Sequence, residues 1–592
     1  MVLAEGAAQP AEAEPLGTRA TAAPVAVAST PYADLDRALA ELSENARAFA
    51  RTPPREKAAL LAQTLPLLLE AARDQVGAAC AAKGIDPALP IAGEEWLAGP
   101  YATVLNVRLL CEALLDIADL GRPSLHGRSI RQRPDGRVEV RVIPRGGPDA
   151  LLSAGFSADV LMRDGVTRDD VTAQQAKFYR EAEPEGGVSL VLGAGNVASI
   201  GPMDALHRLF VHGRVVLLKM SPVNAYLAPF FERAFAPLVE RGVLRVVYGE
   251  ADVGAYLTGH PGISDVHITG SNDTHDRIVW GPPGPERDRR KADGDPVFTR
   301  PITSELGNVS PVIVMPFLYD KDELWYQARG LCTQIVNNAS FNCNAAKMLV
   351  LPAGWAQKDL FLEMLKKALG AVPPRQAYYP GAFERYARLT GERARVVKIG
   401  EADAASLPWT LVLGLDPEEA HEPLFSSEPF CGILSQVSVG SNDPVEFLAA
   451  ATTFCNERLW GTLNCAITTH PLHHDDPTIR AARERAIDEL RYGAVTLNHW
   501  PALAYGFTVT PWGGHPSGTL ANVQSGIGFV HNTLMLEGIE KVVVRGPLRS
   551  TPKPPYFYDN KQMHLIGERL THYAADPSWG KALSIAAAAL RG

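Results

Sequence analysis

The sequence predicts an α/β protein with two parallel-sheet units in series and a small β-hairpin element, and three observations carry this prediction. Short apolar runs alternate with helical patterns from residue 188 to residue 269, as in a parallel sheet with right-handed crossovers. A similar alternation begins at residue 312. Residues 131–146 instead alternate apolar and polar side chains around a Pro-Asp-Gly turn, which is typical of a hairpin.

The region before the first unit is predicted to be helical after a disordered tail. Residues 1–30 are rich in Ala, Pro and Glu, a composition typical of disorder. They lack the basic segment and apolar core of a secretory signal. Apolar residues then recur at helical spacing over 32–82 and 106–120.

The two units can be divided into elements. In the first, we expect strands at 188–192, 215–219, 244–248 and 265–269, and helices at 202–212, 225–241 and 252–258. The segment 281–297, rich in Pro, Gly and charge, is predicted to be a surface loop. After a boundary near 303–306, the second unit has expected strands at 312–315 and 347–351, and helices at 323–337 and 357–369. Residues 550–592 are expected to form a helical appendage.

Composition excludes several classes of function. A formal net charge of −9 and the lack of a clustered basic face argue against nucleic-acid binding. No run of apolar residues is long enough to span a membrane. The seven cysteines are odd in number and form no CxxC pair, which argues against a disulfide framework or a zinc site and fits a reducing cytoplasm. We therefore expect a cytoplasmic protein without a metal.

Four short polar stretches lie at the ends of expected strands or the starts of expected helices, and a fifth lies between an expected helix and an expected strand. They are Gly193-Ala194-Gly195-Asn196, Lys219-Met220-Ser221-Pro222, Thr269-Gly270-Ser271, Ser304-Glu305-Leu306-Gly307 and Asn338–Asn344. Each is ambiguous by itself, because a lone lysine is usually solvated, a glutamate beside glycine often caps a helix, and a lone cysteine is usually core. The GxGxxG fingerprint of a phosphate-binding turn is absent.

In their order and spacing, these stretches resemble the aldehyde dehydrogenase superfamily over residues 187–544. Lys219 lies 23 positions after Asn196, as in that family. Two downstream stretches, Glu428-Pro429-Phe430 and Pro511–Gly518, add to the resemblance. It implies two Rossmann-like domains, an oxyanion-binding Asn196, a nucleophilic Cys343 and a general base, Glu305. It also implies a dinucleotide held by Lys219, Ser221, Gly270, Ser271, Glu428 and Phe430.

The chemistry of an aldehyde dehydrogenase explains why these residue types occur together. Thiolate attack on an aldehyde gives a thiohemiacetal whose oxyanion can expel hydride to a nicotinamide. Donors about 3 Å from that oxygen stabilise it, and the Asn196 amide and the Cys343 N–H are the candidates. Glu305 is the candidate base that activates water to hydrolyse the thioester.

Several departures from the family pattern leave alternatives open. Pro222 stands where the family often has a glutamate that grips the adenosine ribose, so a 2′-phosphate would meet no repulsion there and both NAD and NADP are considered. Gly-Asn-Val after the first strand and Lys-Met-Ser after the second also resemble fatty acyl-CoA reductases, which would use Cys343 to reduce an acyl-CoA. A catalytically silent binding or scaffold protein is a third hypothesis.

The resemblance also implies a domain organisation. We expect a nucleotide-binding domain at 31–130 and 147–304, and a catalytic domain at 305–505. An oligomerisation element at 131–146 and 539–549 would make a homodimer or homotetramer, and the active site would lie between the two large domains.

Overall fold

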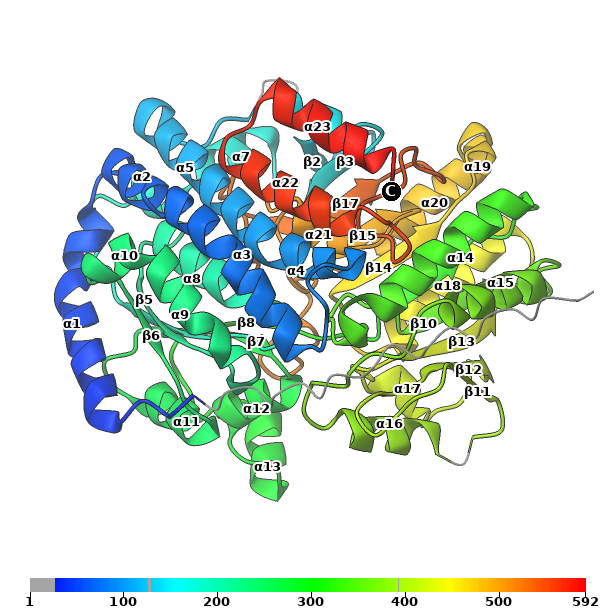
Figure 1. Cartoon of the computed structure of the whole chain (residues 1–592), viewed down its shortest axis with the longest axis horizontal. Coiled ribbons are helices and arrows are strands. Elements are labelled where there is room, and N and C mark those ends of the chain that lie inside the picture. Colours follow the sequence, from blue (N-terminus) through cyan, green and yellow to red (C-terminus); the bar gives the residue numbers. More distant parts are fainter. Residues whose placement is uncertain (1–26, 126–128, 392) are drawn as a thin grey trace, which may run out of the picture.

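The computed structural model describes residues 27–125, 129–391 and 393–592. Two sheets with helices packed around them form the body of the molecule (Figure 1). Most of the expected N-terminal tail lies outside the described residues. Within its expected range, the Thr30 backbone N–H donates to Tyr248 O at 3.1 Å, so ordered chain begins before residue 31.

The first sheet has the strand order β16-β8-β7-β4-β5-β6. Its parallel strands are β4 (Val188–Leu192), β5 (Val215–Lys219), β6 (Leu244–Val247), β7 (Asp265–Gly270) and β8 (Ile302–Leu306), and β16 (Gly526–Ile527) pairs antiparallel with β8. The strands expected at 188–192 and 215–219 are confirmed. Every residue of β5 is buried, as a central parallel strand covered on both faces requires.

Helices connect these strands and cover the sheet. The connecting helices α8 (Ile200–Phe210), α11 (Ala251–Gly259) and α12 (Asn272–Trp280) each follow a strand, and α8 and α1 (Tyr32–Arg51) both pack on β5. The carboxyl ends of β4, β5 and β7 therefore open on one edge, where α/β sheets bind ligands.

Two expectations for the first unit were wrong. The helix predicted at 225–241 is divided into η4 (Pro222–Leu227), α9 (Ala228–Ala234) and α10 (Ala236–Glu240). Pro229 and Pro237 lie at the starts of α9 and α10, because proline fits a first turn and disrupts a helix interior. The predicted loop 281–297 contains a helix, α13 (Pro285–Asp293), in which Arg289 pairs with Glu286 and Asp293.

The second sheet has eleven strands in the order β1-β2-β3-β17-β15-β14-β9-β10-β13-β12-β11. Its parallel centre contains β9 (Pro311–Val314), β10 (Met348–Pro352), β13 (Ile433–Val439), β14 (Asn464–Thr468), β15 (Ala494–Leu497) and β17 (Ile539–Arg545). β12 (Trp409–Leu415) pairs parallel with β13, and β11 (Val396–Ile399) closes that edge antiparallel to β12.

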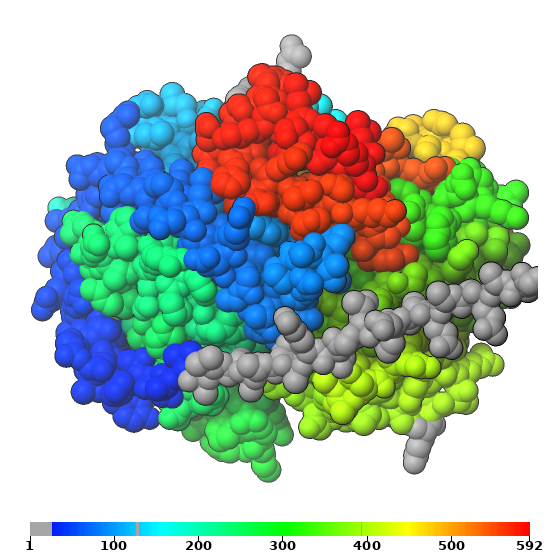
Figure 2. Space-filling view, viewed as in Figure 1, coloured from blue at the N-terminus to red at the C-terminus, as the bar shows by residue number. Residues whose placement is uncertain are grey.

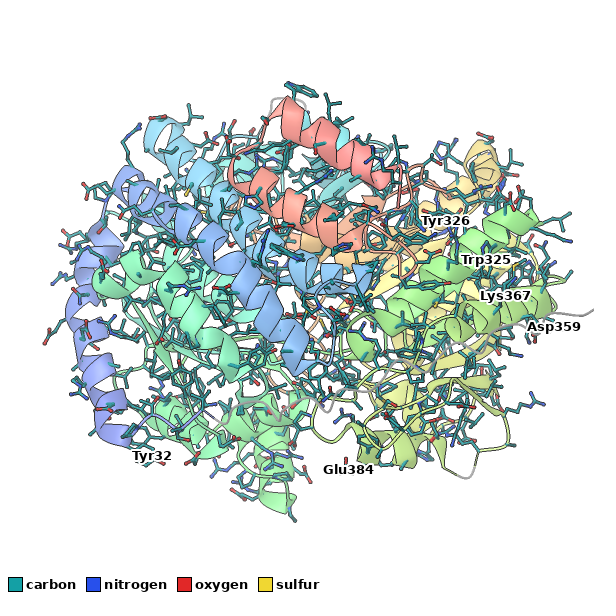
Figure 3. All side chains as sticks on the ribbon, viewed as in Figure 1. Tyr32, Trp325, Tyr326, Asp359, Lys367 and Glu384 are labelled. Carbon is teal, nitrogen blue, oxygen red and sulfur yellow. The ribbon has the colours of Figure 1, made fainter. Side chains whose placement is uncertain are left out.

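Helices on the second sheet include α14 (Lys321–Val336), α15 (Lys358–Gly370), α18 (Pro444–Arg458) and α20 (Pro477–Glu489). α14 packs against α15, and the Lys367 ammonium lies 5.4 Å from the centre of the Trp325 ring across this contact (Figure 3). The strands expected near 312–315 and 347–351 and the helices expected near 323–337 and 357–369 are confirmed within two residues.

The predicted hairpin is confirmed. β1 (Ile130–Gln132) and β2 (Val138–Ile143) pair antiparallel, and β3 (Ser157–Met162) continues this ladder onto β17. β3 thus belongs to the second sheet, although it lies within the range 147–304 expected for the nucleotide-binding domain. The division into domains stays a prediction.

Helices from both ends of the chain pack together. α22 (Met563–Ala575) contacts α3 (Thr64–Ala82), α4 (Gly93–Trp96) and α5 (Ala102–Leu120), and α23 (Trp579–Ala589) packs on α22. The C-terminal helices therefore lie directly on N-terminal ones (Figures 1 and 2).

The remaining short helices are α2 (Pro54–Ala62), η1 (Pro90–Ala92), η2 (Leu97–Tyr101), α6 (Pro148–Leu152), α7 (Arg168–Gln174), η3 (Lys177–Arg180), η5 (Asn337–Ser340), α16 (Ala382–Thr390), α17 (Pro423–Ser426), α19 (Leu472–Asp475) and α21 (Ala502–Gly506). Of the helices described, none is both long and apolar enough to cross a membrane.

Candidate active site

Cys343 and Glu305 meet although they belong to different sheets. Cys343 lies in the loop between η5 and β10 of the second sheet, and Glu305 is on β8 of the first. The Cys343 thiol lies within hydrogen-bonding reach of the Glu305 carboxyl. All seven cysteines are unpaired, and Cys343 is the one among them that is not fully buried. The sequence-predicted nucleophile and base are thus in contact.

The loop that carries Cys343 is fixed through its backbone carbonyls. Lys347 Nζ donates to Ser340 O at 3.2 Å and to Asn342 O at 3.3 Å. The remaining carbonyls of 341–344 accept from the side chains of Asn196, Asn338, Ser310, Asn464 and Trp500. A loop with every carbonyl engaged holds the thiol in one position, which a nucleophile requires.

Three consecutive residues before this loop have left-handed backbone. Asn338, Ala339 and Ser340 have φ values of 51°, 52° and 69°. Such a conformation costs about 1 kcal/mol or more for each non-glycine residue, so surrounding contacts must hold it. Glu94 Oε2 accepts from the Asn338 N–H at 3.0 Å, and the Asn338 amide donates to Phe341 O at 3.1 Å. The N-terminal helices therefore help to shape the nucleophile loop.

Asn196 lies beside the nucleophile loop. It follows β4 and is buried, and its Nδ2 donates to Phe341 O at 3.0 Å, two residues before Cys343. The Asn196 carbonyl in turn accepts from Lys83 Nζ at 3.3 Å and from Tyr378 Oη at 3.2 Å. The structure thus brings together all three predicted catalytic residues, Cys343, Glu305 and Asn196.

The electrostatic surroundings oppose ionisation of both reactive groups. Burial raises the pKa of Glu305 to about 8, and the Asp204 carboxylate adds to this shift, whereas contacts with Trp512 and Cys343 oppose it. Burial, followed by the charges of Glu305 and Glu428, raises the pKa of the Cys343 thiol well above its usual value. The thiol is therefore protonated near neutral pH and needs a base to become a nucleophile.

Glu428 lies against Gly307, directly after the strand that carries Glu305. A side-chain carbon at Gly307 would overlap the Glu428 carboxyl, so any other residue there would displace that carboxyl. Burial raises the pKa of Glu428 to about 7, although Lys347 and the Asn308 backbone N–H oppose the rise. Phe430, two residues further, packs its ring 4.9 Å from that of Tyr379.

Lys219 and Ser221 lie at the carboxyl end of β5. The Lys219 amine is buried and donates to Met220 O at 3.4 Å, and Ser221 Oγ accepts from the N–H of Val223. Burial lowers the pKa of Lys219, while the nearby Glu250 and Asp252 carboxylates raise it. Although Pro222 leaves no carboxylate three residues after the lysine, the carboxylates of Glu250, directly before α11, and Asp252, in its first turn, lie close enough to raise the pKa of the same amine.

Gly270 and Ser271 join β7 to α12. Ser271 precedes the helix and its Oγ accepts from the Thr274 N–H at 3.2 Å, so it is an N-cap. Gly270 is exposed, and an added side-chain carbon would meet only Ile268 at ordinary contact distance. With Lys219, this helix start offers the amine and backbone N–H groups that suit the ribose and pyrophosphate of a dinucleotide.

Sequence reasoning missed three buried residues at this site. Lys347 is fully buried under the nucleophile loop, and Asp204 and Trp512 lie close enough to Glu305 to alter its pKa. Trp512 lies in the stretch Pro511–Gly518, for which the family resemblance implies no catalytic or binding role. A lysine in the middle of an apolar run, at 345–352, is a signal that could have drawn attention to Lys347.

Comparisons with known proteins agree with this geometry. Residues 154–379 match the model of the Aldehyde dehydrogenase family. The chain is 24% identical over 320 residues to N-succinylglutamate 5-semialdehyde dehydrogenase of Burkholderia pseudomallei (strain 1106a), covering 49% of this chain and 61% of that protein. It is 32% identical over 197 residues to betaine aldehyde dehydrogenase of Vibrio vulnificus (strain YJ016), covering 31% of this chain and 37% of that protein. The chain thus spans less than two thirds of the length of these relatives.

Solved structures share the fold. Indole-3-acetaldehyde dehydrogenase in complex with NAD+ superposes with a TM-score of 0.57 at 19% identity, over 89% of this chain and 92% of that one. NADP-dependent glyceraldehyde-3-phosphate dehydrogenase from Bacillus halodurans C-125 in complex with NADP gives a TM-score of 0.55 at 18% identity, over 88% and 92%. The predicted α/β fold with two Rossmann-like domains is confirmed.

Proposed function

We propose that this chain, whose residues 154–379 match the Aldehyde dehydrogenase family model, oxidises an aldehyde to a carboxylic acid through a covalent thioester on Cys343. The observation that carries the proposal is the contact between the Cys343 thiol and the Glu305 carboxyl, with Asn196 beside the same loop. A thiol, a base and an amide donor at one point are the groups that this chemistry requires.

In the first half-reaction, Glu305 removes the thiol proton and Cys343 Sγ attacks the aldehyde carbon. A C–S bond forms, and the carbonyl oxygen becomes an oxyanion. The Asn196 amide, which has a second N–H besides the one bonded to Phe341 O, and the Cys343 backbone N–H donate to that oxygen. A bound nicotinamide dinucleotide supplies the hydride acceptor.

In the second half-reaction, Glu305 takes a proton from water, which attacks the thioester carbon. The new C–O bond forms as the C–S bond breaks, and Cys343 is released. Glu305 can do this only as a carboxylate, so the rise of its pKa to about 8 makes the second half-reaction depend on pH.

Lys219, Ser221, Gly270, Ser271, Glu428 and Phe430 are the residues that we propose for the dinucleotide. Lys219 would donate to ribose hydroxyls, and the first turn of α12 would face the pyrophosphate. Among the proteins of this fold, the indole-3-acetaldehyde dehydrogenase structure contains NAD+ and the Bacillus halodurans structure contains NADP. We propose NAD or NADP as the cofactor, a reducing cytoplasm as the location, and a homodimer or homotetramer that uses the β1–β2 hairpin.

Reduction of an acyl-CoA to an aldehyde is the second candidate. One observation favours it: a Glu305 carboxyl with a pKa of about 8 is largely protonated at neutral pH, and a protonated carboxyl does not activate water. Cys343 would then carry the acyl group without hydrolysing it.

Stopped-flow absorbance of the reduced nicotinamide separates the two functions. The full chain is mixed with NAD or NADP and a panel of aldehydes, and separately with NADPH and acyl-CoA esters. Reduced dinucleotide forming with an aldehyde supports the oxidation, and its consumption with an acyl-CoA supports the reduction. No change with either set, by protein that binds dinucleotide, would contradict both proposals.

A further inference from the structure

Lys83 is a buried lysine that lies between the two parts of the candidate active site. It directly follows α3, and its side chain is 6% exposed. Its Nζ pairs with Glu95 Oε1 on α4 at 2.8 Å, and it donates to Asn196 O at 3.3 Å and to Asn338 Oδ1 at 3.0 Å. An ammonium has three N–H donors, which these three oxygens match in number. One charged atom is thus bonded to α4, to the turn after β4 and to η5, which leads into the nucleophile loop.

The Asn338 side chain extends this contact to the nucleophile loop. A lysine ammonium can only donate, so the atom of the Asn338 amide that it contacts is the oxygen. Tyr378 Oη donates to the same oxygen at 2.9 Å. The Asn338 nitrogen therefore points the other way, and it donates to Phe341 O at 3.1 Å. Asn196 Nδ2 donates to that same carbonyl at 3.0 Å, so Lys83 bonds to the Asn196 backbone and also orients a neighbour of its side chain.

The charge of Lys83 is balanced within a buried group of four side chains. Glu95 pairs with Lys83, and Arg375 Nη1 donates to Glu94 Oε2 at 2.6 Å. Glu94 Oε2 also accepts from the Asn338 N–H at 3.0 Å. Replacing a buried ion pair by apolar side chains often leaves stability unchanged or raises it, so such a pair is weak evidence of a stabilising role. Two pairs that meet at Asn338 instead fit a role in placing the residues around the nucleophile.

The short helix α4, which carries Glu95, is fixed by the C-terminal helix α22 (Figure 1). A side-chain carbon at Gly93 of α4 would overlap Met563, and one at Gly567 of α22 would overlap Trp96. Glycine at both positions lets the two helices approach closely. The C-terminal helices therefore help to hold in place the carboxylate that pairs with the buried ammonium.

Turnover of the kind proposed above depends on where the Asn196 amide points. An oxyanion donor must lie about 3 Å from the substrate oxygen, and a displacement of about 1 Å can lower the rate about 10²-fold. Asn196 follows β4 of the first sheet, whereas the attacking thiol is on the loop before β10 of the second. Neither sheet by itself sets the distance between the amide and the thiol. A group bonded to both sides can set it, and Lys83 is such a group.

We propose that Lys83 is a positioning residue for the oxyanion site. Its ammonium holds Asn196 against the nucleophile loop, so that the second N–H of the Asn196 amide points to the substrate oxygen. The proposal rests on the proposed function. Lys83 acts through Asn196 and moves no proton, so it changes the rate of the first half-reaction and leaves the binding of aldehyde and dinucleotide unchanged.

The test is a double-mutant cycle on the rate of the first-turnover burst of reduced dinucleotide at saturating aldehyde. Lys83→Met and the charge-balanced Lys83→Met/Glu95→Gln are made alone and together with Asn196→Ala. Lys57→Met is the matched control, because Lys57 is also a buried lysine of the N-terminal helices and donates to a backbone carbonyl, Ala50 O, at 3.3 Å. Melting temperatures show which variants keep the fold.

We expect both Lys83 variants to lower the burst rate at least about tenfold, because the oxyanion donor is misplaced. The aldehyde concentration that gives half the maximal burst rate should change less than about twofold. In the Asn196→Ala background the same substitutions should also change the burst rate less than about twofold, since the amide that Lys83 positions is gone. Lys57→Met should leave the burst rate of the unmodified chain.

An unchanged burst rate in the Lys83 variants, or a loss of equal size with and without the Asn196 amide, would overturn the proposal. If the Lys83 variants do not fold, Tyr378→Phe takes their place, because Tyr378 Oη donates to the same two oxygens, Asn196 O at 3.2 Å and Asn338 Oδ1 at 2.9 Å. Tyr378→Phe should lower the burst rate by itself and leave it unchanged in the Asn196→Ala background. No loss from Tyr378→Phe by itself would also overturn the proposal.

Hydrogen exchange of the peptide 337–344 needs no turnover. We expect faster exchange there in Lys83→Met than in Lys57→Met, because the side chain that orients Asn338 is lost. Equal exchange in the two variants would contradict the link between Lys83 and the nucleophile loop. If this difference in exchange is present but the unmodified chain shows no burst, the proposed function is contradicted instead.

Discussion

The Glu305 carboxyl lies against the Cys343 thiol, although β8 belongs to the first sheet and the loop that carries Cys343 leads into β10 of the second. Their contact depends on how the two sheets pack. It also raises the pKa of the thiol further above the value that burial alone produces, so Cys343 is inert until its proton is removed. A resting thiol protected in this way fits a nucleophile that acts only when a substrate is present.

The amide of Asn196 is expected to stabilise the negative charge that develops on the substrate oxygen. Asn196→Ala should lower the rate of the first-turnover burst by about 10²- to 10³-fold, because one oxyanion donor is lost. Stopped-flow absorbance measures this rate. Asn456→Ala, at the end of α18, is the control and should leave it unchanged. A burst rate in Asn196→Ala within about twofold of the unmodified chain would refute the oxyanion role.

The steady-state rate of aldehyde oxidation should rise with pH. Burial and Asp204 raise the pKa of Glu305 to about 8, and only the carboxylate form accepts a proton from water. Below that pH the protonated form dominates and deacylation is slow, and above it the carboxylate dominates and deacylation is fast. The steady-state rate of aldehyde oxidation should therefore increase through a midpoint near pH 8. Glu305→Gln should abolish that midpoint, and a rate that is flat or falls across this range would count against Glu305 as the base.

Lys347 is expected to stabilise the fold as well as the loop. Lys347→Met removes a charged donor from Ser340 O and Asn342 O and should lower the free energy of unfolding by roughly 3 kcal/mol. Urea unfolding gives this value. The control Lys366→Met breaks an exposed pair with Glu363 and should cost less than about 0.5 kcal/mol. Equal stabilities for the two variants would show that the buried amine contributes little.

Cofactor choice should favour NAD. The Glu250 and Asp252 carboxylates are exposed and close enough to act on Lys219, so a 2′-phosphate beside that amine would meet negative charge. Glu250→Gln should shift the ratio of kcat/KM for NAD over NADP about tenfold towards NADP, equivalent to about 1.4 kcal/mol. Glu418→Gln, an exposed carboxylate after β12, is the control. An unchanged ratio of kcat/KM for NAD over NADP would show that Glu250 does not act at the ribose site.

The sequence predicted the elements whose burial is uniform along the chain. β4 and β5 were predicted residue for residue, because a strand buried on both faces is a short run of mostly apolar residues. The three catalytic candidates were predicted because each lies in a short stretch with a recognisable order.

Elements whose bounds depend on single prolines or on local ion pairs were predicted less well. The division of 222–240 depends on prolines that can begin a helix as well as end one, and α13 depends on charged pairs within a polar segment. Asp204 and Lys347 could not be assigned from sequence, because their roles come from partners on other elements. Asp204 is on α8, which follows β4, and it contacts Thr269, which lies 65 positions later on β7, the strand beside β4.

The most direct test of the account is mass spectrometry of the acyl-enzyme. The unmodified chain is mixed with an aldehyde and NAD, quenched in acid within the first turnover and digested. The peptide carrying Cys343 is expected to gain the mass of the aldehyde less two hydrogens, and Cys343→Ala is expected to show no such peptide. Reduced dinucleotide formed without this adduct, or an adduct on a different cysteine, would contradict the account.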